Sequence, residues 1–123
     1  MSANPFATDD MAAGYASSRP PVHPDVLRLA LPGDKPRRAL DIGCGAGLST
    51  AALPPFTSHA VGLEPAVSML AWHSSIAPQS DFLAARAETL PFPAATFPLL
   101  TAAGSLNYVH HLPSFFAEAA RVL

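Results

Sequence analysis

The stretch Ala39-Leu40-Asp41-Ile42-Gly43-Cys44-Gly45-Ala46-Gly47-Leu48 decides how the rest of the sequence is interpreted. A short apolar segment that ends abruptly at three alternating glycines is typical of a buried strand followed by a tight turn and a helix. Glycine lets the backbone bend sharply and approach a ligand closely, and the start of the next helix offers free N–H groups. The stretch therefore predicts a strand–loop–helix unit with a ligand site at the loop.

Strands and helices of the same kind are predicted along the rest of the chain. Apolar segments predict further strands at residues 59–63, 82–85 and 97–103, and helical patterns lie at 25–31, 48–53, 65–76 and 113–123. Alternating strands and helices are typical of βαβ units. We therefore predict an α/β fold, a Rossmann-like parallel sheet of about four strands with flanking helices. Residues 1–24 are predicted to form a flexible N-terminal arm, and residues 25–123 the domain.

The composition fits one packed domain. The chain has 123 residues, of which 50% are apolar and 13% are charged, which argues against a disordered tail. The net charge of −2, with no run of Lys or Arg, gives no reason to expect a nucleic-acid partner. No apolar run approaches the ~20 residues that a membrane-spanning helix needs. The single cysteine, Cys44, excludes an internal disulfide and favours a reducing, cytoplasmic location.

The loop does not fit the common phosphate-binding motifs. The dinucleotide fingerprint G-x-G-x-x-G would need a third glycine where Leu48 or Thr50 stands, and no Gly-Lys-Ser/Thr occurs. Asp41 at the strand end would repel a phosphate. Glu64 ends the second strand roughly 20 residues after the loop, where an acidic side chain can accept hydrogen bonds from ribose hydroxyls. These features favour a nucleoside that has no phosphates and carries a positive centre. The alternative is a tight turn of an unrelated protein, with Glu64 as a helix N-terminal charge.

Several ordered motifs resemble one family. They are Asp41 to Gly47 at the loop, Val61-Gly62-Leu63-Glu64-Pro65, Ala85-Arg86-Ala87-Glu88-Thr89-Leu90-Pro91-Phe92, Glu118 to Leu123, and Tyr15 with Arg19-Pro20 in the arm. Together they resemble class I S-adenosylmethionine-dependent methyltransferases of type 11, the UbiE-like group. The chain departs from that pattern at Ala85-Arg86, where the family often has Gly-Asp, and at Phe97-Pro98, where it usually has Phe-Asp.

The resemblance implies S-adenosyl-L-methionine as cofactor and a set of residues that bind it. The implied residues are Asp41, Gly43, Cys44, Gly45, Gly47, Glu64, Pro65, Arg86, Ala87, Glu88 and Gly104. The glycines would line the methionine part, with Asp41 near its amino group. Glu64 would hold the ribose hydroxyls, and Ala87 with its neighbours would border the adenine. The stretch after the fourth strand, Gly104-Ser105-Leu106-Asn107, would pass close to the sulfonium.

The catalytic residues are less specified than the cofactor site. Methyl transfer from a sulfonium depends mainly on alignment, and a general base is needed only if the nucleophile must lose a proton. His110 and His111 follow the fourth strand and are the candidates for a base or for orienting the substrate. Alternatively, they are loop residues before the helix that starts at Pro113. His23 and His73 lack nearby Cys, Asp or Glu residues at metal-ligand spacing, so we predict no metal site.

We expect a methyltransferase that acts on a small-molecule acceptor. The family pattern continues past Leu123 into a Gly-Gly turn and three more strands, so the sequence is expected to be truncated. The fourth strand would then have an unpaired apolar edge, which predicts self-association, a partner chain or instability. A second hypothesis is a non-catalytic cofactor-binding remnant or interaction module. A third, an NAD-dependent oxidoreductase, is opposed by the failed fingerprint at Leu48 and Thr50.

Overall fold

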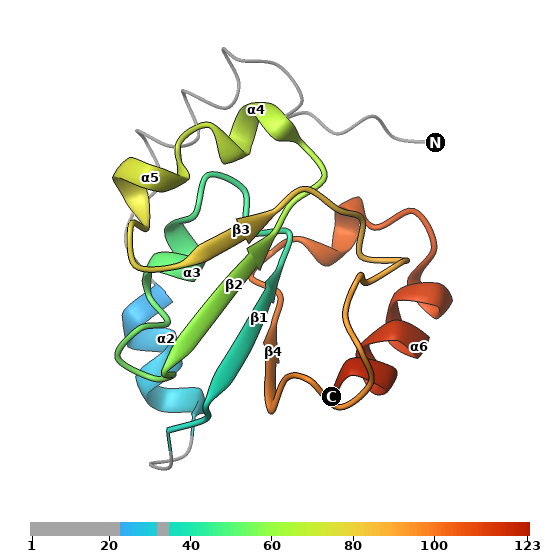
Figure 1. Ribbon diagram of the computed structural model, residues 1–123, viewed down its shortest axis with the longest axis horizontal. Helices are drawn as coiled ribbons and strands as arrows, with labels where there is room; N and C mark the ends of the chain where they lie inside the picture. Colours follow the sequence, from blue (N-terminus) through green and yellow to red (C-terminus); the bar gives the residue numbers. More distant parts are fainter. Residues whose placement is uncertain (1–22, 32–34) are drawn as a thin grey trace.

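The computed structural model describes residues 23–31 and 35–123 (Figure 1). Its elements are α2 (His23–Ala30), β1 (Arg38–Ile42), α3 (Leu48–Ala51), β2 (His59–Leu63), α4 (Val67–Leu70), α5 (His73–Ile76), β3 (Asp81–Leu83), β4 (Leu99–Thr101), the 3-10 helix η1 (Leu106–Tyr108) and α6 (Leu112–Val122). Within these residues the strands form one parallel sheet in the order β3-β2-β1-β4. The predicted α/β fold is confirmed. Residues 1–22 of the predicted arm, including Tyr15 and Arg19, lie outside the described residues.

The strand order places β1 at the point where the chain reverses its direction across the sheet. Leu40 of β1 pairs with Val61 of β2 on one side and with Leu100 of β4 on the other. The chain therefore moves outward from β1 to β2 and β3, and then returns past them to form β4. In open parallel sheets, ligands bind outside the carboxyl ends of the strands at such a switch point. The loop after β1 lies at that position.

Successive residues of β1 face two separate cores. Leu40 and Ile42 are buried with Phe115 of α6, whereas Ala39 is buried with Leu53, which follows α3. This alternation follows from the two-residue period of a strand. Figure 1 shows the same division, with α6 on one side of the sheet and α2 to α5 on the other. Both faces of the sheet are covered, as parallel sheets require.

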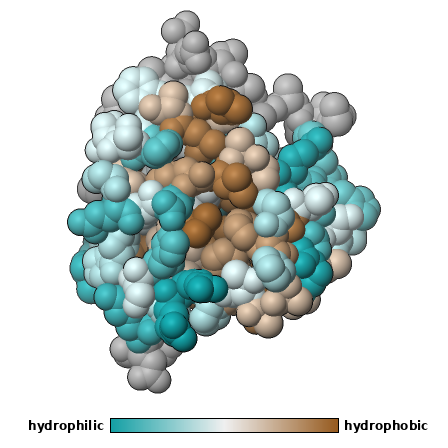
Figure 2. All heavy atoms as spheres, viewed as in Figure 1, coloured by the Kyte–Doolittle hydropathy of each residue, from teal (hydrophilic) through white to brown (hydrophobic). Residues whose placement is uncertain are grey.

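Some apolar surface remains exposed. The space-filling view shows apolar side chains gathered across the middle of one face, with polar side chains on both flanks (Figure 2). Large apolar residues with substantial exposure include Val26, Leu29, Val67, Trp72, Leu83, Tyr108, Leu112, Phe116 and Leu123. None of the helices in the described part of the chain is long and apolar enough to cross a membrane.

The single helix predicted over residues 65–76 is wrong, because the segment forms the two short helices α4 and α5. Ala66 is extended, with φ −86° and ψ 104°, and its N–H donates to the Glu64 carboxylate. Pro65 therefore precedes the helix and does not lie in its first turn. At Trp72 the N–H donates to the carbonyl of Met69, three residues back, which interrupts the α-helical pattern.

Three other predicted elements are shorter in the structure. The helix expected over 48–53 ends at Ala51, and the strands expected over 82–85 and 97–103 cover only Asp81–Leu83 and Leu99–Thr101. Phe97 is buried, but its N–H donates to the carbonyl of Val122 in α6. Phe97 is thus buried by packing against α6 and not by pairing in the sheet.

Two side chains of α6 hold the segment that returns from β3 to β4. The guanidinium of Arg121 donates to the carbonyls of Phe92 and Leu90, at 2.7 and 2.9 Å. Glu118 accepts a hydrogen bond from the Leu90 N–H at 2.8 Å and another from Arg121 at 2.7 Å. Residues 90–92 are therefore fixed to α6, which also constrains the preceding residues 86–88.

Candidate functional site

The loop after β1 follows a backbone path that favours glycine at three positions. Gly43, Gly45 and Gly47 have φ angles of 64°, 59° and 110°. Residues that carry a Cβ rarely adopt this left-handed region of φ and ψ. Between these glycines, the Cys44 N–H donates to the carbonyl of Leu63 at 3.1 Å, so the loop stays attached to the end of β2. The alternating glycines of the sequence are thus explained by the turn itself.

Gly43 also makes room for the segment after β4. A Cβ added at Gly43 would lie 2.3 Å from the Cβ of Ser105. Ser105 is buried, and its hydroxyl donates to the carbonyl of Ile42 at 2.8 Å. The neighbouring Gly104 has φ 68°, and a Cβ there would meet nothing within 4 Å. Ser105 belongs to the segment that the family resemblance places near the sulfonium, and its hydroxyl joins the ends of β1 and β4.

Glu64 is an acidic residue that bonds directly to the loop. Its side chain is buried, with Oε1 accepting from the Gly45 N–H at 3.1 Å and Oε2 from the Ala66 N–H at 2.7 Å. Burial raises the pKa of the Glu64 carboxyl, and the hydrogen bonds from Ala66 and Gly45 offset this only in part. An ionised carboxylate offers about four acceptor sites, so hydroxyl donors can still bind beside the two N–H groups.

Asp41 is fully buried beneath the loop. Its Oδ2 accepts from the hydroxyls of Ser49 at 2.5 Å and Thr50 at 2.8 Å, and its Oδ1 accepts from Thr101 at 2.9 Å. The carboxylate therefore ties β1 to α3 and to β4. A role near the amino group of a cofactor stays a prediction. The sequence did carry a signal for two of these partners, because two hydroxyl residues open the helix directly after the glycines.

Cys44 and Pro65 complete the first group of predicted site residues. The thiol of Cys44 is buried and lies 3.7 Å from the Gly45 carbonyl. Burial, followed by the charges of Asp41 and Glu64, raises the pKa of this thiol. A raised pKa disfavours the reactive thiolate, which agrees with a small packed side chain. Pro65 is exposed between two buried residues.

The second group of predicted residues lies on the segments after β3 and β4. A guanidinium nitrogen of Arg86 lies 2.6 Å from Nδ1 of His110. Oε2 of Glu88 accepts from the backbone N–H groups of His110 and His111, at 2.9 and 3.2 Å. Ala87, between these two charged residues, is buried in the core beside α6. The structure thus brings Arg86, Glu88 and both histidines together, whereas the Ala87 side chain points into the core.

Electrostatics keeps Glu88 ionised. Burial acts to raise the pKa of the Glu88 carboxyl, but its own backbone N–H, those of His110 and His111, and the charge of Arg86 together lower it. The carboxylate therefore remains a hydrogen-bond acceptor at neutral pH. His111 has a further contact, since its Nδ1 accepts from the Ser114 N–H at 3.2 Å and caps α6. That contact matches the alternative in which His111 is a loop residue that starts the helix.

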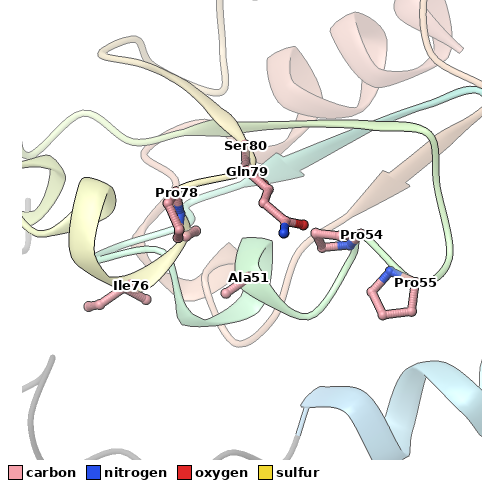
Figure 3. A pocket seen from close by; sticks show the side chains of 8 residues that line it. Ala51, Pro54, Pro55, Ile76, Pro78, Gln79 and Ser80 are labelled. Atoms are coloured by element: carbon pink, nitrogen blue, oxygen red, sulfur yellow. The ribbon is translucent and has the colours of Figure 1, made fainter.

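A surface hollow of about 300 Å³ lies beside α3. Its lining comes from α3 and the segments that lead into β2 and β3, namely Ala51, Pro54, Pro55, Ile76, Ala77, Pro78, Gln79 and Ser80 (Figure 3). Two of these residues reach the glycine loop, since Ile76 packs against the cluster that contains Ala46 and Ala77 would lie 3.6 Å from a Cβ on Gly47. The hollow therefore adjoins the last part of the loop from the side of α3. In the described ranges, no group of three or more His, Cys, Asp or Glu residues comes together to hold a metal.

Comparison with known proteins assigns the chain to a family. A family model described as a methyltransferase domain matches residues 40–123, which is more than half of the chain. The chain belongs to this methyltransferase family. It is 32% identical over 91 residues to the uncharacterized methyltransferase YcgJ of Bacillus subtilis. That alignment covers 70% of this chain and 36% of the relative.

Solved structures share the fold. The methyltransferase aligns with the crystal structure of B. subtilis YcgJ at TM-score 0.72 and 29% identity, over 80% of this chain and 44% of that one. An S-adenosylmethionine-dependent methyltransferase from Aquifex aeolicus aligns at TM-score 0.77 and 16% identity, over 94% and 66% of the two chains. The [4+2]-cyclase SpnF aligns at TM-score 0.70 and 23% identity, over 81% and 39%. The chain thus spans less than half the length of YcgJ.

Proposed function

We propose that this methyltransferase chain binds S-adenosyl-L-methionine at the carboxyl ends of β1, β2 and β4. The observation that carries the proposal is the position of Glu64, whose carboxylate is bonded to the Gly45 N–H within the glycine loop. A buried acidic acceptor beside a sharply bent loop suits a ribose diol, which donates two hydrogen bonds. The loop of residues 43–47 has no basic side chain, which suits a nucleoside without phosphates.

The remaining cofactor contacts follow from the same geometry. The sharply bent loop of Gly43, Gly45 and Gly47 would line the methionine part, and Gly104 borders open space where a ligand atom could lie. The anionic charges of Asp41 and Glu64 would favour a cationic ligand over a polyphosphate. Arg86, Ala87 and Glu88 would border the adenine, as the family resemblance implies.

The proposed reaction is the transfer of a methyl group to a small-molecule acceptor. Bound S-adenosylmethionine supplies an activated methyl group, whose bond to sulfur breaks as the acceptor's lone pair forms the new bond to carbon. The protein's contribution is alignment of the two reactants. This chain spans only part of its relatives' length, so we propose both the acceptor class and the activity of the whole protein.

A second candidate is cofactor binding without methyl transfer. One structural neighbour is described as a [4+2]-cyclase, so proteins of this fold are not all named for methyl transfer. The same cofactor site could serve such a protein. Binding of S-adenosylmethionine with no transfer to any acceptor tested would favour this candidate.

Isothermal titration calorimetry with S-adenosylmethionine and S-adenosylhomocysteine tests the proposal. We expect Glu64→Gln to weaken binding about tenfold, because an uncharged amide replaces an ionised acceptor, a change of about 1.5 kcal/mol. Asp25→Asn is the matched control, since it also removes one carboxylate but lies exposed on α2. NAD is expected not to compete. Absence of binding by the unaltered chain at millimolar cofactor, or equal effects of the two substitutions, would contradict the proposal.

A further inference from the structure

The segments that follow β3 and β4 meet, although these strands form opposite edges of the sheet. Three hydrogen bonds join them, one from Arg86 to the His110 ring and two from backbone N–H groups to Glu88. Both the backbone and the imidazole of His110 are therefore held from the other segment. The contact lies on residues that follow the carboxyl ends of their strands, the same edge as the glycine loop.

The bond from Arg86 determines which nitrogen of His110 carries the proton. A guanidinium has five N–H donors and no acceptor, so it can only donate to Nδ1. Nδ1 must then offer its lone pair, which places the proton of the neutral ring on Nε2. A ring in this state donates through Nε2 and has no spare lone pair for a second proton. His110 is therefore arranged as a hydrogen-bond donor and not as a general base.

His111 differs from His110 in what its ring does. Its Nδ1 accepts from the Ser114 N–H at the start of α6 and lies 2.6 Å from the Ser114 hydroxyl. That ring is committed to capping the helix. Glu88 holds the backbone of both histidines, whereas only His110 is held through its ring by Arg86. His111 thus caps α6, whereas His110 is held as an oriented hydrogen-bond donor.

We propose that Arg86 and Glu88 are positioning residues that hold His110 as an Nε2–H donor for the methyl acceptor. This inference rests on the proposed function, because methyl transfer is what brings an acceptor to this edge. The acceptor is then a molecule with an oxygen or nitrogen lone pair that can bind the Nε2–H. Its nucleophilic atom bonds to the methyl carbon, the electron pair of the carbon–sulfur bond goes to sulfur, and any proton lost goes to water.

Nuclear magnetic resonance of the ¹⁵N-labelled chain, without cofactor, tests this positioning. Long-range ¹H–¹⁵N correlation spectra distinguish the two tautomers of a histidine ring, and the His110→Gln variant identifies the signals of that ring. We expect the Nε2–H pattern in the unaltered protein and a mixture of tautomers in Arg86→Leu. We also expect Glu88→Ala to shift the His110 and His111 backbone amides, and Glu88→Gln, which keeps an acceptor oxygen, to restore them. Arg28→Leu, which removes an exposed arginine paired on α2, is the matched control.

An Nδ1–H pattern for His110, or the same pattern in Arg86→Leu as in the unaltered protein, would overturn the inference. If Arg86→Leu does not fold, Arg86→Lys serves instead. We expect a smaller fraction of the Nε2–H tautomer in this variant too, because a lysine ammonium reaches Nδ1 less well. Titration of the same sample with S-adenosylhomocysteine reports the proposed function separately, through the Gly45 amide. An unmoved Gly45 amide would refute the cofactor site, whereas the tautomer result tests Arg86 and Glu88 directly.

Discussion

Two physical constraints act on the glycines near the loop after β1, a positive φ angle and close packing against a neighbour. The sequence pattern does not show which of them applies at a given glycine. Gly43 has a positive φ and also lies against Ser105, whereas Gly104 has a positive φ with open space beside it. Conformational strain alone would affect both positions, but steric overlap would affect only the first. The alternating glycines predicted a tight turn correctly. Their contact with the segment after β4 could not be predicted, because it joins residues about 60 positions apart through the fold.

We expect Gly43→Ala to lower the free energy of unfolding by about 3 kcal/mol, from left-handed strain plus overlap with Ser105. Gly104→Ala is the matched control and should cost about 1 kcal/mol, because it adds strain without a clash. Urea unfolding followed by circular dichroism measures both values. Equal losses at the two positions would show that the Ser105 contact is unimportant.

The buried carboxyl of Glu64 makes stability depend on pH. Its pKa in the folded chain is raised by burial above the ordinary value of 4.5. A raised pKa stabilises the fold most below the unfolded pKa, and this stabilisation is lost as pH rises through the folded pKa. The free energy of unfolding of the unaltered protein, relative to Glu64→Gln, should therefore fall as the pH rises above the ordinary glutamate pKa. A relative stability that rises over this range would contradict the assigned direction.

Among the secondary structure elements, β1 and β2 were predicted best and the segment from Pro65 to Ile76 worst. Both strands are apolar runs that end at glycines or at Glu64, and the structure places them within one residue of the prediction. The long helix failed because the Ala66 N–H donates to the Glu64 carboxylate, a local contact that delays the helix, and because the α-helical pattern is interrupted at Trp72. At the site, the limit comes from packing. Gly45 and Glu64 were both chosen from sequence, but the hydroxyls around Asp41 depend on how three elements pack.

Arg121 holds residues 90–92 against α6 through hydrogen bonds to two backbone carbonyls. Arg121→Met should lower the melting temperature and speed hydrogen exchange at the Leu90 amide, because the carbonyls of Leu90 and Phe92 lose their donor. The hydrogen bond from Arg121, followed by that from Leu90, lowers the pKa of Glu118. Its stabilisation is thus present above the ordinary glutamate pKa and is lost as pH falls through the folded pKa. Arg28→Met on α2 is the control, and equal effects of the two substitutions would contradict this role of Arg121.

At the scale of the whole molecule, the sheet ends at β4 in the described residues. Leu99, Leu100 and Thr101 are all half-buried, and the outer side of this strand has no neighbouring strand in the sheet order. The family match and the fold agree with the sequence-based prediction. The chain spans 36% of the length of its B. subtilis relative, and self-association of the chain at the β4 edge remains our prediction.

An unpaired parallel strand presents a row of backbone N–H and carbonyl groups that a second copy can pair with. We therefore expect dimers that increase with concentration in sedimentation equilibrium, together with slower exchange of the amides in β4 at high concentration. A competing surface is the outer face of α6, where Phe116 is 55% exposed. Phe116→Glu removes that apolar contact without altering the core, so dimerisation through β4 should survive this substitution. Loss of dimers in Phe116→Glu, with unchanged exchange in β4, would assign association to α6 and refute the edge.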